Sequence, residues 1–244
     1  MAYTLTPVQF KCDVDILTTA DSGPRRAEMI KFGCFHTTEN SDDTPPDNVA
    51  KWQLDRANQS SYNVLFGTNG RTVRGNDDNY KPWAAGPTAN TYGVHGSAIG
   101  RASRTREQWL KYPKQLEAMA QWAADVSKRY GLPLVWLTPE QLRAGARGFC
   151  SHDTVSKAWR EVNHTDPGPG FPHDLVLERA RVILAGGETV ADNRSAADLT
   201  LDQLAGYPWH KWQGWPQLAG LTLVDAVATI GAALNIDGFK DMRK

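Results

Sequence analysis

The sequence predicts an α/β fold in which helices flank a mixed central β-sheet. Three observations lead to this prediction. Short apolar runs of strand length alternate with segments whose apolar residues recur at helical spacing. The pair Asn69-Gly70 stands between two such runs and predicts a hairpin, so that at least two strands are antiparallel. A long amphipathic segment in the middle of the chain is suited to cover one face of the sheet.

The first half of the chain supplies most of the expected strands. The run Met29–Phe35 predicts a buried strand that leads directly into His36. A polar loop follows, and Asp47 is expected to cap a helix that runs to about Asn58. The remaining predicted elements are hairpin strands at 61–67 and 71–74, a polar loop at 76–90 that carries Trp83, and a core strand at 91–100 that contains His95.

The second half begins with the long amphipathic segment. A single helix is expected from Thr105 to about Tyr130, and Gly131 ends it. Its apolar stripe consists of Trp109, Leu116, Met119, Trp122, Ala123 and Val126. The later elements are a short buried strand at 134–137, a brief helix that starts at Thr138-Pro139, and a helix at 175–184.

Two regions are expected along the chain: a main domain at 1–195 and a tryptophan-rich extension at 196–244. Gly186-Gly187 and the polar residues after it predict a linker. In the extension, Trp209, Trp212 and Trp215 recur at every third residue, and one amphipathic helix is predicted at 222–234. We expect the extension to pack on the main domain. Glycan binding, or a hinge before a further domain, remain open alternatives.

Composition excludes several classes of function. The formal net charge is zero, so nothing predicts a general attraction to nucleic acid. No apolar run approaches the roughly 18 residues that span a bilayer, so no membrane partner is expected. The segment Met1–Lys11 lacks the features of a secretory signal peptide. The three cysteines are too few and too scattered for a disulfide framework, and nothing predicts the oligomeric state.

The candidate functional residues are histidines and a carboxylate. His152, His164 and Asp166 lie in one short stretch, and His36 ends an apolar run far upstream. Two imidazoles with one carboxylate are the ligands of a catalytic zinc site, in which the fourth position stays open. Pro167-Gly168 would hold the loop and aim the carboxylate of Asp166. The pattern leaves His164 as either a ligand or a catalytic group.

Simpler interpretations exist for each of these residues. Cys34-Phe35-His36 and Cys150-Ser151-His152 share the spacing Cys-x-His, which would also suit a structural zinc tetrad. No Cys-x2-Cys pair supports the tetrad, and buried free cysteines are the simpler explanation. Asp166 could be an ordinary turn residue before Pro-Gly. Tyr62, whose hydroxyl could orient an attacking water, could be a core tyrosine.

Several motifs in this order resemble the zinc-dependent N-acetylmuramoyl-L-alanine amidases of type 2, a family that includes the peptidoglycan recognition proteins. The motifs are His36-Thr37-Thr38-Glu39, Ser61-Tyr62 with its Asn-Gly hairpin, His152, and His164-Thr165-Asp166-Pro167-Gly168. The resemblance covers about residues 25–185. It is greatest to the amidase domains of endolysins from phages of actinobacteria, where a segment like Arg104–Leu110 also occurs. It implies an amidase-like fold and a peptidoglycan substrate, and we expect the actinobacterial, meso-diaminopimelate type.

The resemblance also implies roles for particular residues. His36, His152 and Asp166 match the zinc ligands, and His164 matches the group that stabilises the tetrahedral intermediate. Tyr62 matches a tyrosine that positions water in some phage members. Other members use a glutamate on a central strand, and the corresponding stretch Ile99–Ala102 has no acid. We further expect substrate contacts from Thr37, Trp83, His95 and Thr165.

The resulting hypothesis is an endolysin that cleaves the amide bond between N-acetylmuramic acid and L-alanine. Such a protein would accumulate in the host cytoplasm and reach the cell wall through a pore made by another protein. Two alternatives remain. A peptidoglycan-binding module would bind without cleaving, although all three ligand positions are filled here. A muropeptide-recycling amidase would use the same ligands but act on soluble fragments.

Overall fold

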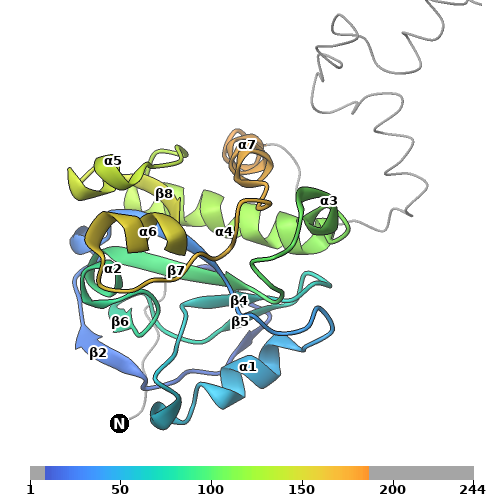
Figure 1. The fold of residues 1–244 in the computed structure, drawn as a ribbon, viewed down its shortest axis with the longest axis horizontal. Coiled ribbons are helices and arrows are strands. Elements are labelled where there is room, and N and C mark those ends of the chain that lie inside the picture. The colour runs from blue at the N-terminus through green and yellow to red at the C-terminus, as the bar shows by residue number, and fades with distance from the viewer. Residues whose placement is uncertain (1–8, 187–244) are drawn as a thin grey trace, which may run out of the picture. The chain divides into compact units, whose positions relative to one another are not determined.

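The computed structural model describes residues 9–186 (Figure 1). Its strands are β1 (Val14–Asp15), β2 (Asp21–Pro24), β3 (Phe32–Thr37), β4 (Val64–Phe66), β5 (Thr72–Arg74), β6 (Tyr80–Pro82), β7 (Gly93–Ala98) and β8 (Gly148–Ser151). Its α-helices are α1 (Pro46–Trp52), α2 (Pro87–Tyr92), α3 (Arg106–Trp109), α4 (Pro113–Tyr130), α5 (Pro139–Arg143), α6 (His152–Trp159) and α7 (His173–Leu184). Short 3-10 turns occupy Ala27–Met29 and Arg56–Asn58.

The main sheet has six strands in the order β1-β5-β4-β7-β3-β8. Strands β4 and β5 form the expected antiparallel hairpin, whereas β4, β7, β3 and β8 run parallel to one another. This mixed sheet with flanking helices confirms the predicted α/β class. Strands β2 and β6 form a separate antiparallel pair. The carboxyl ends of β3 and β8 lie side by side, so residues that follow these two strands meet at one edge.

Helices cover both faces of the sheet. Helix α4 covers the face to which Phe35, Val64, Phe66 and Val94 point, and α7 packs against α4 (Figure 1). On the opposite face, α1 packs on Leu65 and Val73. Near the other end of that face, α2 and α6 pack on Phe32 and Cys34. Because side chains alternate along a strand, His36 shares the face of Phe32 and Cys34, away from α4.

The prediction of a single helix from Thr105 to Tyr130 is wrong in one respect, because the segment forms two helices, α3 and α4. Thr105, where the helix was expected to start, caps α3 through a capping box with Gln108. Pro113 then starts α4, because proline lacks the amide proton that a continuing helix needs and suits a first turn. Gly131 ends α4 with a φ of 61°, in the left-handed region, as expected.

Other boundaries also differ from the predictions. The helix expected from Asp47 to Asn58 starts at Pro46 and ends at Trp52. The expected polar loop at 76–90 contains β6 and the start of α2, and α6 is absent from the predicted elements. In the expected strand at 134–137, only Trp136 forms an isolated bridge, to Phe149. The boundary at 195 and the extension at 196–244 lie outside the described residues.

Within residues 9–186, no helix is both long and apolar enough to cross a bilayer.

Candidate metal centre

Two neighbouring parallel strands place His36 and His152 together. His36 is the fifth residue of β3, and His152 is the first residue of α6, directly after β8. The register pairs Phe35 with Ser151, which brings the two histidines side by side although 116 residues separate them. Ser151 caps α6 by accepting the amide proton of Thr154, so that the helix begins at His152 and turns the chain over the site.

A tight loop after α6 carries Asp166 to the two histidines. The Gly168 amide donates to the Thr165 carbonyl, and the Asp153 amide donates to the Asp166 carbonyl. The Thr37 amide, at the end of β3, donates to Oδ2 of Asp166 at 3.2 Å. Gly168 has a φ of 83°, and a Cβ there would lie 1.9 Å from the carbonyl oxygen of Ala102. Only glycine therefore permits this close approach.

The donor atoms of these three residues converge. Nδ1 of His36 lies 3.1 Å from Nδ1 of His152 and 3.2 Å from Oδ2 of Asp166. Nδ1 of His152 lies 3.0 Å from Oδ1 of Asp166. Tetrahedral zinc with bonds of about 2.0–2.1 Å separates its ligand atoms by about 3.3 Å. Two imidazoles and one carboxylate at these separations fit a zinc ion and leave one of four positions for water or substrate.

The electrostatics of the centre favour a cation. Burial lowers the pKa of His36 to about 4, so the ring is neutral and has a lone pair to offer. Burial acts to raise the pKa of Asp166, but its close contacts with His152 and His36 outweigh burial and lower this pKa below its ordinary value. The centre thus combines neutral imidazole with an ionised carboxylate, as metal binding requires.

One hollow reaches a ligand of the centre, and a second lies beside a neighbouring tyrosine. His152 and His164 line a cleft of about 520 Å³ together with Trp83. Tyr62 and Thr38 line a second cleft, of about 380 Å³. His164 is exposed and stacks on His152, and the ring of Tyr62 lies 5.1 Å from the ring of His36. Burial and the charge of Asp166 raise the pKa of Tyr62, so its hydroxyl keeps its proton at neutral pH.

The four residues from which substrate contacts are expected lie in different surroundings. Thr37 is buried and binds Asp166 through its amide. Trp83 lines the larger cleft, where its indole nitrogen donates to Ser22 and the Arg56 guanidinium covers its ring. Thr165 is exposed beside a third hollow, under the Asp166 loop. His95 is fully buried on β7, behind His36.

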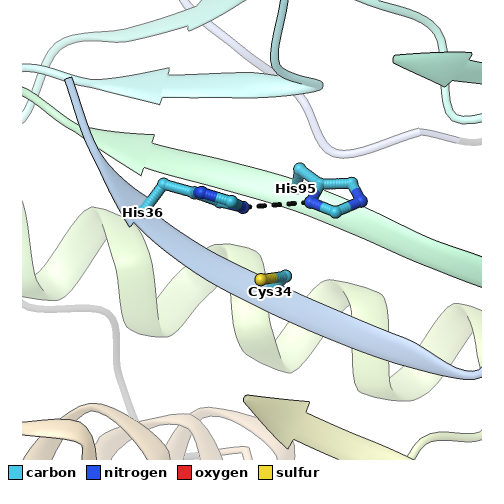
Figure 2. Close-up of side chains that lie close together, drawn as sticks. All are labelled: Cys34, His36 and His95. Carbon is cyan, nitrogen blue, oxygen red and sulfur yellow. Dashed lines mark hydrogen bonds between the residues drawn. The ribbon is translucent and has the colours of Figure 1, made fainter. Parts of the chain in front are cut away.

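A second group of possible ligands shares His36. Cys34, His36 and His95 lie on the same face of β3 and β7, and Nε2 of His36 faces Nδ1 of His95 at 3.0 Å (Figure 2). Burial and the neighbouring Cys150 raise the pKa of the Cys34 thiol, which keeps it protonated. The two histidines are already joined by a hydrogen bond. This group is therefore suited to support His36 rather than to bind a metal of its own.

Several residues to which the sequence assigns no role support the centre through hydrogen bonds. The side chain of Asn63 accepts the amide proton of His95 at 2.8 Å, and the Asn63 amide donates to the His95 carbonyl. The Ala89 carbonyl faces Nε2 of His95 at 3.1 Å. Glu39 accepts hydrogen bonds from Thr37 and from the amide of Ala102. Asn63 directly follows Tyr62, but only the strand register shows that it contacts His95.

The chain is similar in sequence or fold to known proteins. The endolysin of Listeria phage A511 is 26% identical over 136 residues, which are 56% of this chain and 38% of the endolysin. The chain thus spans well under half the length of this relative. The fold is similar to that of the Staphylococcus aureus hydrolase AmiA, with a TM-score of 0.55 at 16% identity over 73% of this chain and 88% of AmiA.

Residues 26–169 match the family described as N-acetylmuramoyl-L-alanine amidase. The matched segment is more than half of the chain, and it contains His36, His152 and Asp166. The chain therefore belongs to the N-acetylmuramoyl-L-alanine amidase family.

Proposed function

We propose that this protein is a zinc-dependent amidase that hydrolyses the bond between N-acetylmuramic acid and the L-alanine of the peptidoglycan stem peptide. The observation that carries this proposal is the convergence of His36, His152 and Asp166 within 3.2 Å of one another, in a chain of the amidase family. A non-catalytic binding module has no need of two histidine nitrogens and a carboxylate that fit a zinc ion and leave one position open.

In the proposed mechanism, zinc, when bound, supplies the Lewis acidity that activates water and polarises the amide carbonyl. The protein holds the other groups in place. The substrate occupies the cleft lined by Trp83, His152 and His164. His164 donates a hydrogen bond to the carbonyl oxygen as negative charge develops on it. The protonated hydroxyl of Tyr62 lies on the other side of His36 and orients the attacking water.

The biological role that we propose is that of a phage endolysin. The similarity to an endolysin from Listeria phage A511 supports this role. The motifs around His164 support an actinobacterial host and a wall of the meso-diaminopimelate type. We propose that the protein accumulates in the host cytoplasm and reaches the wall when another phage protein opens the membrane.

The test is mass spectrometry of purified mycobacterial peptidoglycan after incubation with the zinc-loaded protein. Cleavage releases stem peptides that begin with L-alanine and leaves the glycan strands intact. Chelation of the metal should abolish the release, and so should His36→Ala. His173→Ala is the matched control, because His173 stacks on Trp136 outside the metal centre. It should retain the activity of the wild type.

Other outcomes would reject parts of the proposal. Zinc binding without peptide release from any peptidoglycan would reject the amidase function. Release from soluble muropeptides but not from intact wall would favour a recycling amidase over an endolysin. Equal release from lysine-type and diaminopimelate-type walls would reject the proposed wall preference.

A further inference from the structure

His95 is held rigidly directly behind the candidate metal centre. Its side chain is fully buried on β7, where the ring meets Phe32 edge to face. Two hydrogen bonds with Asn63 fix its backbone: the Asn63 side chain accepts the His95 amide proton, and the Asn63 amide donates to the His95 carbonyl. The ring nitrogens contact two groups: Nδ1 faces Nε2 of His36 at 3.0 Å, and Nε2 faces the Ala89 carbonyl at 3.1 Å.

The direction of these hydrogen bonds follows from the acceptor at the far end. The Ala89 carbonyl can only accept, so Nε2 of His95 carries a proton. A neutral imidazole has a single ring proton, and a fully buried ring that faces no carboxylate is neutral. Nδ1 of His95 is therefore an acceptor, and Nε2 of His36 must donate to it. The remaining nitrogen, Nδ1 of His36, keeps its lone pair.

A count of protons leads to the same arrangement. Three contacts lie in a row: Ala89 with His95, His95 with His36, and His36 with Asp166. Two neutral rings supply two protons, so one of the three contacts has none. If the contact at Ala89 lacked the proton, a buried lone pair would face a carbonyl oxygen at 3.1 Å. If the contact at Asp166 lacks it, a cation can take its place beside a carboxylate.

We propose that His95 is a positioning residue that sets the tautomer of His36, so that Nδ1 of His36 points a lone pair at His152 and Asp166. The proposal rests on the metal site of the proposed function, and it assigns a role to a residue that never touches metal or substrate. Figure 2 shows the two rings on adjacent strands, joined end to end by the hydrogen bond. Groups behind a histidine ligand commonly orient the ring and fix its proton in this way.

Direct observation of the protons tests this proposal without any substitution. Long-range ¹H–¹⁵N correlation spectra of the metal-free protein report which nitrogen of each imidazole carries hydrogen. We expect Nε2–H for both His95 and His36, with Nδ1 of His36 unprotonated. Addition of zinc should shift Nδ1 of His36 and leave Nε2 protonated. A proton on Nδ1 of His36 in the metal-free protein, with Nε2 of His36 unprotonated, would overturn the proposal.

Two substitutions separate the hydrogen-bond role from packing. His95→Gln offers an amide oxygen to His36 and an amide N–H to Ala89, whereas His95→Leu offers neither. We expect His95→Leu to weaken zinc binding by about 10- to 100-fold, the usual effect of losing such a partner. His95→Gln should recover most of this affinity. Zinc affinity is measured by competition with a chelating dye.

Val94→Ala is the matched control for a purely structural role. Val94 is equally buried on β7 but points to the opposite face, into the core under α4. Val94→Ala should lower the melting temperature of the metal-free protein and leave zinc affinity unchanged.

Wild-type zinc affinity in His95→Leu, or no recovery of affinity in His95→Gln with its fold intact, would overturn the role of His95. Failure of the wild type to bind zinc would overturn the metal site itself. Zinc binding with the expected tautomers, but without peptide release, would reject only the amidase function.

Discussion

The imidazole ring of His164 lies flat against the ring of His152, with centroids 4.5 Å apart and planes inclined by 16°. His152 is in turn held by Asp166 through Nδ1. The stack therefore holds an exposed imidazole beside the candidate metal centre, on the cleft that Trp83 also lines. This geometry favours the catalytic interpretation of His164 over the ligand interpretation.

The stack predicts the effect of His164→Ala. Zinc content should stay at the level of the wild type, whereas turnover should fall by roughly 100-fold or more, the usual cost of losing an oxyanion donor. Metal analysis of the purified variant and the rate of peptide release measure the two quantities. Loss of zinc from the variant would show that His164 is a ligand.

The buried His36 predicts acid sensitivity of the metal-free protein. Its folded pKa of about 4 lies below its ordinary value of 6.5, so the unfolded chain binds more protons in this range. The contribution of His36 to stability is complete above pH 6.5 and is lost as the pH falls towards 4. Melting temperatures from pH 8 to 4 should decline more steeply for the wild type than for His36→Asn. Parallel curves would contradict this prediction.

The Asp166 loop predicts unequal effects of two glycine substitutions. Gly168 and Gly145 have nearly the same φ, 83° and 81°, so alanine costs about 1 kcal/mol of backbone strain at each. Only at Gly168 does the added Cβ meet a carbonyl oxygen, that of Ala102, whereas Gly145 has open space. Gly168→Ala should lower the melting temperature much more than Gly145→Ala and weaken zinc binding. Similar melting temperatures for both variants would reject the close approach.

Removal of the Tyr62 hydroxyl is expected to lower the rate of hydrolysis without loss of the metal. Tyr62→Phe keeps the ring beside His36 and removes the hydroxyl, so turnover should fall by roughly 100-fold. The raised pKa of Tyr62 means that the hydroxyl acts in its protonated form, so the variant should keep the shape of the wild-type pH–rate profile. Tyr92→Phe, at the end of α2, is the control. An unchanged rate in Tyr62→Phe would leave the orientation of water to another group.

Local chemistry explains which elements could be predicted from the sequence. The Asn69-Gly70 hairpin, the helix start at Thr105 and the helix end at Gly131 each depend on one or two residues, and all three were predicted. The break at Pro113 is equally local, but the continuous apolar stripe on both sides obscured it. Strand β6 is polar and pairs with the distant β2. Its sequence therefore has no alternation of apolar and polar residues from which a strand could be predicted.

In the site, too, local motifs could be predicted from the sequence, whereas contacts that depend on strand pairing could not. The motifs place His36, His152 and Asp166 within one matched family segment, and the structure brings all three together. The contact between His95 and His36 depends on the parallel register that pairs Cys34 with His95. Nothing in either strand alone sets this register, because both are buried and almost wholly apolar or small. The role of His95 could therefore not be deduced before the strands were aligned.

The separation of 116 residues between His36 and His152 has a consequence for synthesis. A nascent chain presents the first ligand early and the other two only after β8 and the Asp166 loop have left the ribosome. A chain that ends before β8 lacks both His152 and Asp166, and one that ends before the Asp166 loop still lacks the carboxylate, so neither holds the complete set of ligands. The complete ligand set therefore forms only after β8 has paired with β3, so that the candidate metal centre is assembled late in synthesis.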